Sequence, residues 1–172
     1  MTSCRAGAGT GTYAPVMTDA PGSADCAREI AAARDRLLAF AVTCTAEEWQ
    51  SHALDEHGDP RPVGVVIDHV ADAYEYLAGW ISEIAGGVTP AVSPSLVDEL
   101  NERHAAGAGQ VSQGEAAAHL RGSGDAIAAL VASLTAAQLD AADGMGRRLA
   151  QIAARHADSH RAELEAAVRS SA

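Results

Sequence analysis

The sequence predicts an all-α protein, a four-helix bundle with additional short helices. The 172 residues are 48% hydrophobic, much of it alanine, and they include one Phe, two Trp and three Tyr. This composition favours closely packed helices over sheet. Apolar residues also recur every three or four positions over long segments, which is the period of a helix with one buried face. The length suits one domain with a substantial core.

Four long segments carry the helical period, and each begins or ends at a recognisable signal. The clearest begins at Pro62, whose missing N–H is tolerated in a first helical turn, and ends at Gly86-Gly87. Ser23 is the expected N-cap of the first segment, and Asp143-Gly144 breaks the chain before the last. The expected long helices span about residues 24–44, 62–85, 113–134 and 145–169.

Capping signals predict shorter helices between the long ones. Thr45 with Glu48, and Thr135 with Gln138, have the spacing at which two side chains cap one helix end reciprocally. Proline and glycine mark the remaining boundaries. The expected shorter elements are helices near residues 46–50, 95–109 and 136–142, and a turn at 58–60 within a polar segment.

Charge and cysteine content exclude several classes of protein. The net charge is −11, so the chain repels phosphate backbones and no nucleic-acid partner is expected. Cys4, Cys26 and Cys44 are odd in number and far apart, which indicates neither a disulfide framework nor a zinc knuckle. No segment has the length of a membrane span or a signal peptide, so we expect no membrane partner and a reducing cytoplasm. Residues 1–22 are interpreted as a disordered leader before one domain at 23–172.

Three histidines fall within apolar helix stripes. The stripe of the last helix has a spacing of three or four and consists of Leu149, Ile152, Ala153, His156, His160, Leu164 and Ala167. His69 lies in the same way between Val66 and Ala73. Histidines four apart turn both rings to one side, and a third from a facing helix would give three nitrogen ligands with positions left open for water or substrate. Buried histidines bonded to backbone or carboxylate groups would produce the same pattern, so both interpretations stay open.

The segments "PVGVVIDHVADAYEYLAGW" (62–80) and "RHADSHRAEL" (155–164) resemble the second and last helices of the DinB-like superfamily. Trp49 and the spacing between the motifs also resemble that family, and residues 100–140 are similar in layout to the connecting region of its actinobacterial members. The resemblance covers about residues 24–169. It implies a four-helix bundle in which His69, His156 and His160 hold a divalent metal, zinc first and nickel second. Some members use thiol cofactors, among them mycothiol-dependent maleylpyruvate isomerase and the mycothiol or bacillithiol S-transferases.

Five further residues are candidates around this site. Asp72 and Glu163 each lie about one turn beyond a histidine, where a carboxylate either fixes a ligand's tautomer, acts as a general base or is simply a solvated charge. His104 either faces the pocket or is partly exposed. Tyr76 and Trp80 are either core residues or the apolar wall of a substrate pocket. No functional role is assigned to His52, His57 and His119, of which His119 is interpreted as a surface or packing residue. Cys44 is interpreted as a small buried residue.

Two classes of function follow from these residues. The first is a metalloenzyme acting on a small molecule, with transfer of a mycothiol-type thiol as its leading form and isomerisation or hydrolysis in specialised metabolism as others. The second is a bundle that binds a small molecule or a partner without turnover. Exposed alanine-rich helix faces also allow a homodimer.

Overall fold

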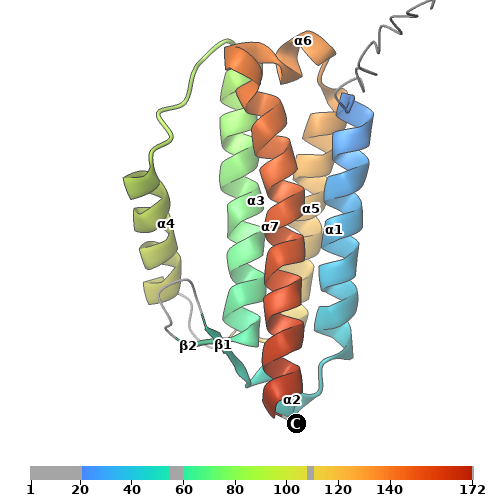
Figure 1. Cartoon of the computed structure of the whole chain (residues 1–172), viewed down its shortest axis with the longest axis vertical. Coiled ribbons are helices and arrows are strands. Elements are labelled where there is room, and N and C mark those ends of the chain that lie inside the picture. The colour runs from blue at the N-terminus through green and yellow to red at the C-terminus, as the bar shows by residue number, and fades with distance from the viewer. Residues whose placement is uncertain (1–20, 55–59, 108–110, 172) are drawn as a thin grey trace, which may run out of the picture.

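Four long helices lie side by side in the computed structural model, which describes residues 21–54, 60–107 and 111–171 (Figure 1). They are α1 (Ser23–Thr43), α3 (Val63–Ala85), α5 (Gln113–Ser133) and α7 (Ala141–Ser171). Helices α1 and α3 each pack against both α5 and α7, and buried residues from all four form one core. The predicted all-α bundle with additional short helices is confirmed.

The short helices begin at the predicted capping signals. In α2 (Ala46–Trp49) the Thr45 hydroxyl accepts a hydrogen bond from the Glu48 N–H at 3.2 Å. In α6 (Ala136–Leu139) the Thr135 hydroxyl accepts one from the Gln138 N–H at 3.2 Å. Helix α4 (Pro94–Gly107) runs alongside α3, outside the four-helix bundle (Figure 1). Local capping chemistry was therefore sufficient to predict where α2 and α6 start.

The segment between α2 and α3 contains a strand pair that the sequence did not predict. Strands β1 (His52–Leu54) and β2 (Pro60–Pro62) pair antiparallel. Pro62 has an extended backbone (φ −57°, ψ 146°), so it precedes α3 and does not lie in its first turn. The Val63 N–H instead donates to the Ser51 carbonyl at 3.0 Å. Two prolines interrupt the alternation that identifies a strand, which is why this ladder left no sequence pattern.

The starts of two helices can be compared with their predicted boundaries. The N-cap of α1 is Gly22, not Ser23, and the Gly22 N–H donates to the Asp25 carboxylate at 3.1 Å. In α7, positive φ values of 51° at Ala142, 55° at Asp143 and 76° at Gly144 break the helix, as the sequence predicted. The regular part of α7 therefore begins after Gly144.

The buried face of α7 is rotated relative to the predicted stripe. Its buried members are Leu149, Ala150, Ala153, Ala154, Ala157 and Leu164. Ile152 is 41% exposed, so its placement in the core was wrong. Because each helical residue advances about 100° around the axis, Ile152, His156 and His160 form one row at the edge of this face. The two histidines therefore lie at the rim of the core, beside α3.

Three further predictions concern membrane spans, the N-terminal segment and the cysteines. Among the described residues, no helix is long and apolar enough to cross a membrane. Residues 1–20 of the predicted leader lie outside the described part of the chain, as do Cys4 and His57. Cys26 is buried, Cys44 is only half-buried rather than buried, and neither forms a disulfide.

Candidate metal centre

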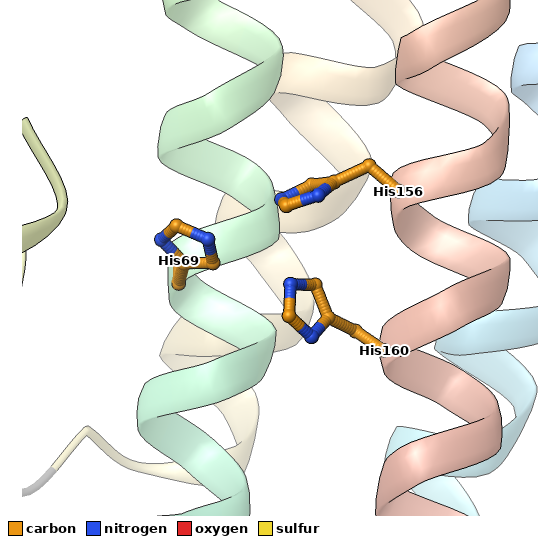
Figure 2. Close-up of side chains that lie close together, drawn as sticks. All are labelled: His69, His156 and His160. Carbon is orange, nitrogen blue, oxygen red and sulfur yellow. The ribbon is translucent and has the colours of Figure 1, made fainter. Parts of the chain in front are cut away.

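Three imidazole rings from two helices converge between α3 and α7. His69 projects from α3, and His156 and His160 project toward it from α7 (Figure 2). One ring nitrogen of each lies within 4.8 Å of the other two. The ring centroids are 5.1 Å apart for His69 and His156, 5.3 Å for His69 and His160, and 4.4 Å for His156 and His160. The structure thus brings together the three histidines that the spacing singled out, and we call them the triad.

The triad follows directly from helix geometry. His156 and His160 are four residues apart, so they stack on one side of α7. On α3, the buried residues Val66 and Val70 fix the rotation of the helix, which leaves His69 at the edge of the interface. Two rigid helices, not loops, therefore hold the rings in place.

The environment of the triad keeps two of its imidazoles, those of His69 and His156, neutral. Burial, reinforced by the imidazoles of His160 and His104, lowers the pKa of His69 to about 4. Burial, again with the neighbouring imidazoles, lowers the pKa of His156 to about 3. A neutral imidazole has one nitrogen with a free lone pair, which is the form that binds a metal.

The nitrogen atoms of the triad fit a bound cation. The Nε2 atom of His156 is buried and has no hydrogen-bond partner among the described residues. A buried polar atom without a partner is costly, and a cation at the point of convergence would satisfy it. Three neutral imidazoles are a donor set suited to zinc or nickel, and they leave further coordination positions open.

Glu163 contacts a histidine of the triad, which was one of the alternatives predicted for this carboxylate. The Nδ1 atom of His160 lies 2.8 Å from a carboxylate oxygen of Glu163. This bond places the hydrogen on Nδ1 and leaves Nε2 of His160 available for binding.

Asp72 contacts a different histidine from the one expected. The sequence placed Asp72 one turn beyond His69, yet its carboxylate lies 2.7 Å from Nδ1 of His104. Nε2 of His104 lies 3.2 Å from the Val65 carbonyl, and the His104 side chain is only 7% exposed. The His104 ring is 5.5 Å from that of His69. His104 therefore faces the site, and Asp72 reaches it through His104.

The two aromatic candidates lie along α3 above the triad. Both Tyr76 and Trp80 are half-buried, and Trp80 packs against the core. At about 1.5 Å of rise per residue, the backbone of Trp80 lies roughly 16 Å along the helix from His69. Trp80 thus packs against the core away from the triad, whereas a role for Tyr76, about 10 Å along the helix, stays a prediction. The fully buried tyrosine of this helix is Tyr74, which the sequence did not single out.

A second cluster, on the α5 side of α3, was missed because His119 was given no role. Asp68, Asp72 and Glu75 share one face of α3, and a regular spacing of four and three was the available signal. Nδ1 of His119 lies 2.7 Å from Asp68, and Nε2 lies 3.3 Å from Glu75 and 3.8 Å from Asp72. Burial lowers the pKa of His119, but the hydrogen bonds to Asp68 and Glu75 outweigh it and raise the pKa above its usual value. The ring nitrogens of His119 thus have carboxylate partners, whereas the triad includes a buried nitrogen without a partner.

A small cleft lies near the strand pair and does not include the triad. Its volume is about 150 Å³, and it is lined by Trp49, Gln50, His52, Pro62, Gly64, Val65 and Val111. The Trp49 indole N–H donates to the Val111 carbonyl at 3.1 Å and closes one side. The cleft is smaller than a typical substrate pocket, so we do not assign a substrate to it.

Comparison with known proteins places this chain in one family. The chain matches the sequence model of the DinB superfamily over residues 29–164, more than half of its length. The protein is therefore a member of the DinB superfamily, as the resemblance implied. The matched region contains the triad and Glu163. No curated protein and no solved structure matches the chain.

Proposed function

We propose that this protein is a metal-dependent enzyme that acts on a small molecule. His69, His156 and His160 would hold a divalent ion, zinc in the first place and nickel in the second. The observation that carries the proposal is the convergence of three ring nitrogens around a point where Nε2 of His156 is buried without a partner. Separate bonds from each histidine to backbone or carboxylate groups would have favoured a structural role instead.

The chain's own residues support this chemistry through protonation and orientation. Burial keeps His69 and His156 neutral, so these two rings carry no positive charge that would repel a cation. Glu163 orients His160, while its own exposed fraction of 46% leaves it in contact with solvent. A divalent ion held by neutral imidazoles would supply the positive charge that favours a thiolate over a thiol at neutral pH.

The leading reaction in this proposal is transfer of a low-molecular-weight thiol of the mycothiol type to an electrophilic small molecule. Membership of the DinB superfamily supports it, because some members use such thiols. The same residues would serve isomerisation or hydrolysis. The free thiols of Cys26 and Cys44 support a reducing compartment, which we propose is the cytoplasm.

Metal analysis of untagged protein tests the proposal, followed by calorimetric titration with Zn²⁺ and Ni²⁺. We expect about one ion per chain. The double variant His156→Ala, His160→Ala should keep its helical circular dichroism and lose the metal. His119→Ala, from the second cluster, is the matched control and should retain it. Native affinity in the double variant would refute the site.

Activity is then measured with thiols and electrophiles on the metal-loaded protein. Turnover that disappears in the double variant supports the enzyme. Ligand binding without turnover by the metal-loaded protein would favour the binding bundle instead.

A further inference from the structure

Helix α4 is attached to the bundle by few buried side chains. None of its described residues is fully buried, whereas α3 buries residues along its whole length. Its apolar side chains Leu96 and Leu100 are half-buried, and Val97 is 37% exposed. Figure 1 shows α4 beside α3 only, apart from the other long helices. A segment with so little apolar burial opens more readily than the core around it.

The deepest contact of α4 is a polar one, made by His104. Its Nδ1 lies 2.7 Å from the Asp72 carboxylate and its Nε2 lies 3.2 Å from the Val65 carbonyl. Both acceptors belong to α3 and are seven residues apart, so one side chain of α4 bridges two turns of α3. The His104 side chain is 7% exposed, which protects the bond to Asp72 from competition by water.

These bonds also distinguish His104 from a metal ligand. The Asp72 carboxylate only accepts, so a neutral His104 has its hydrogen on Nδ1, and its Nε2 lies against the Val65 carbonyl of α3. Nε2 of His156, by contrast, is buried without a partner. His104 lies beside the triad, 5.5 Å from the His69 ring, but its nitrogens are not among those that converge there.

We propose that His104 is a positioning residue that clasps α4 to α3 and thereby shields His69. When the clasp to Asp72 and Val65 is broken, α4 separates from α3 and His69 becomes accessible. This inference goes beyond the proposed function because it concerns access to the triad and does not require a bound metal.

Hydrogen exchange followed by mass spectrometry tests the clasp on the full chain. His104→Ala should raise the opening equilibrium of peptides from 94–107 about tenfold or more, while α1 and α5 exchange as in the native protein. Alanine is a better helix former than histidine, so a loss of helix propensity cannot cause this result. The matched control is Arg103→Ala, which removes an exposed side chain bonded only to Glu99 within α4 among the described contacts. Unchanged exchange of α4 in His104→Ala would overturn the clasp.

Acylation by diethyl pyrocarbonate tests the shielding, on chelator-treated protein whose fold is checked by circular dichroism. The rate at His69 is compared with that at His52, an exposed internal reference. We expect several-fold faster acylation of His69 in His104→Ala. A loosened α4 with an unchanged rate at His69 would overturn the shielding.

Asp72→Ala distinguishes the effect of the clasp from the effect of the bulk of the His104 ring. It leaves the imidazole in place and removes its hydrogen-bond acceptor. It should loosen α4 and expose His69 as His104→Ala does, and the double variant should add little further. If His69 becomes exposed in His104→Ala but not in Asp72→Ala, the bulk of the His104 ring alone shields His69. That result would overturn the clasp. If His104→Ala fails to fold, His104→Asn, which keeps a donor for Asp72, and Asp72→Ala decide the same question.

Discussion

The Nδ1 atom of His160 lies 2.8 Å from a carboxylate oxygen of Glu163, one turn further along α7. An ionised carboxylate only accepts, so the hydrogen is on Nδ1 and the lone pair of Nε2 is free. The Ser159 hydroxyl donates to the other Glu163 oxygen at 3.3 Å and helps to hold the carboxylate. The orientation of one triad imidazole therefore depends on a residue outside the triad.

Removing this carboxylate should weaken metal binding. We expect Glu163→Ala to lower the affinity for Zn²⁺ about 10- to 100-fold, because His160 loses the partner that fixes its tautomer. Glu163→Gln keeps an acceptor oxygen and should have a smaller effect. Competition with a chromophoric chelator measures both. Glu165→Gln, whose carboxylate pairs with Arg161, is the control, and equal affinity in Glu163→Ala and native protein would contradict the role of Glu163.

Replacing a triad histidine by an apolar residue should stabilise the metal-free protein while abolishing metal binding. His156→Leu removes a buried nitrogen that has no partner, so the free energy of unfolding should rise by about 1 kcal/mol. His119→Leu is the contrasting variant. It leaves Asp68 and Glu75 without their partner and should lower the free energy of unfolding by about 1 kcal/mol. Urea unfolding with chelator present measures both, and a destabilised His156→Leu would show that Nε2 is satisfied.

The metal-free protein should lose stability as the pH falls below about 6.5, the pKa of an unfolded histidine. The pKa values of His69, about 4, and His156, about 3, are depressed in the folded state. The unfolded chain therefore binds more protons in this window, and stability present above pH 6.5 is lost as the pH falls through these values. The two residues together should cost on the order of 3 kcal/mol between pH 6.5 and 5.

Urea unfolding at several pH values measures this loss. His156→Leu removes one of the two depressed groups and should show a shallower pH dependence. An identical dependence in the native protein and the variant would contradict the depressed pKa of His156.

Two nearby glycines of α5 should respond oppositely to alanine. A Cβ at Gly124 would lie 2.5 Å from Cδ of Arg34, whose guanidinium is held by Asp35 and Asp125. Gly124→Ala should therefore lower the free energy of unfolding by about 1–3 kcal/mol.

The matched control is Gly122, where a Cβ would meet nothing within 4 Å. Gly122→Ala should raise the free energy of unfolding by about 0.5–1 kcal/mol, because alanine is the better helix former. Thermal or urea unfolding compares the two variants, and equal effects would contradict the close approach of α1 and α5 at Gly124.

The sequence by itself determined the helices, the caps of the short helices α2 and α6, and the members of the triad. These features depend on interactions within one or two turns. The hydroxyl of Thr45 caps the helix that follows it, and His156 and His160 share a side of any helix that contains them. The apolar period of α3 likewise placed His69 within an apolar stripe without knowledge of its neighbours, and packing puts it at the edge of the buried face.

Only the tertiary structure decided which side chains meet across elements. Asp72 forms a hydrogen bond with His104 and not with His69. His119 contacts carboxylates of α3, although it was assigned no functional role. The rotation of α7 exposes Ile152, and the strand pair ahead of α3 displaces Pro62 from the helix. Each outcome depends on how two elements are rotated and spaced against each other. That setting is fixed by packing over the whole core, such as the close approach of Arg34 to Gly124. A local pattern of residue types does not contain it.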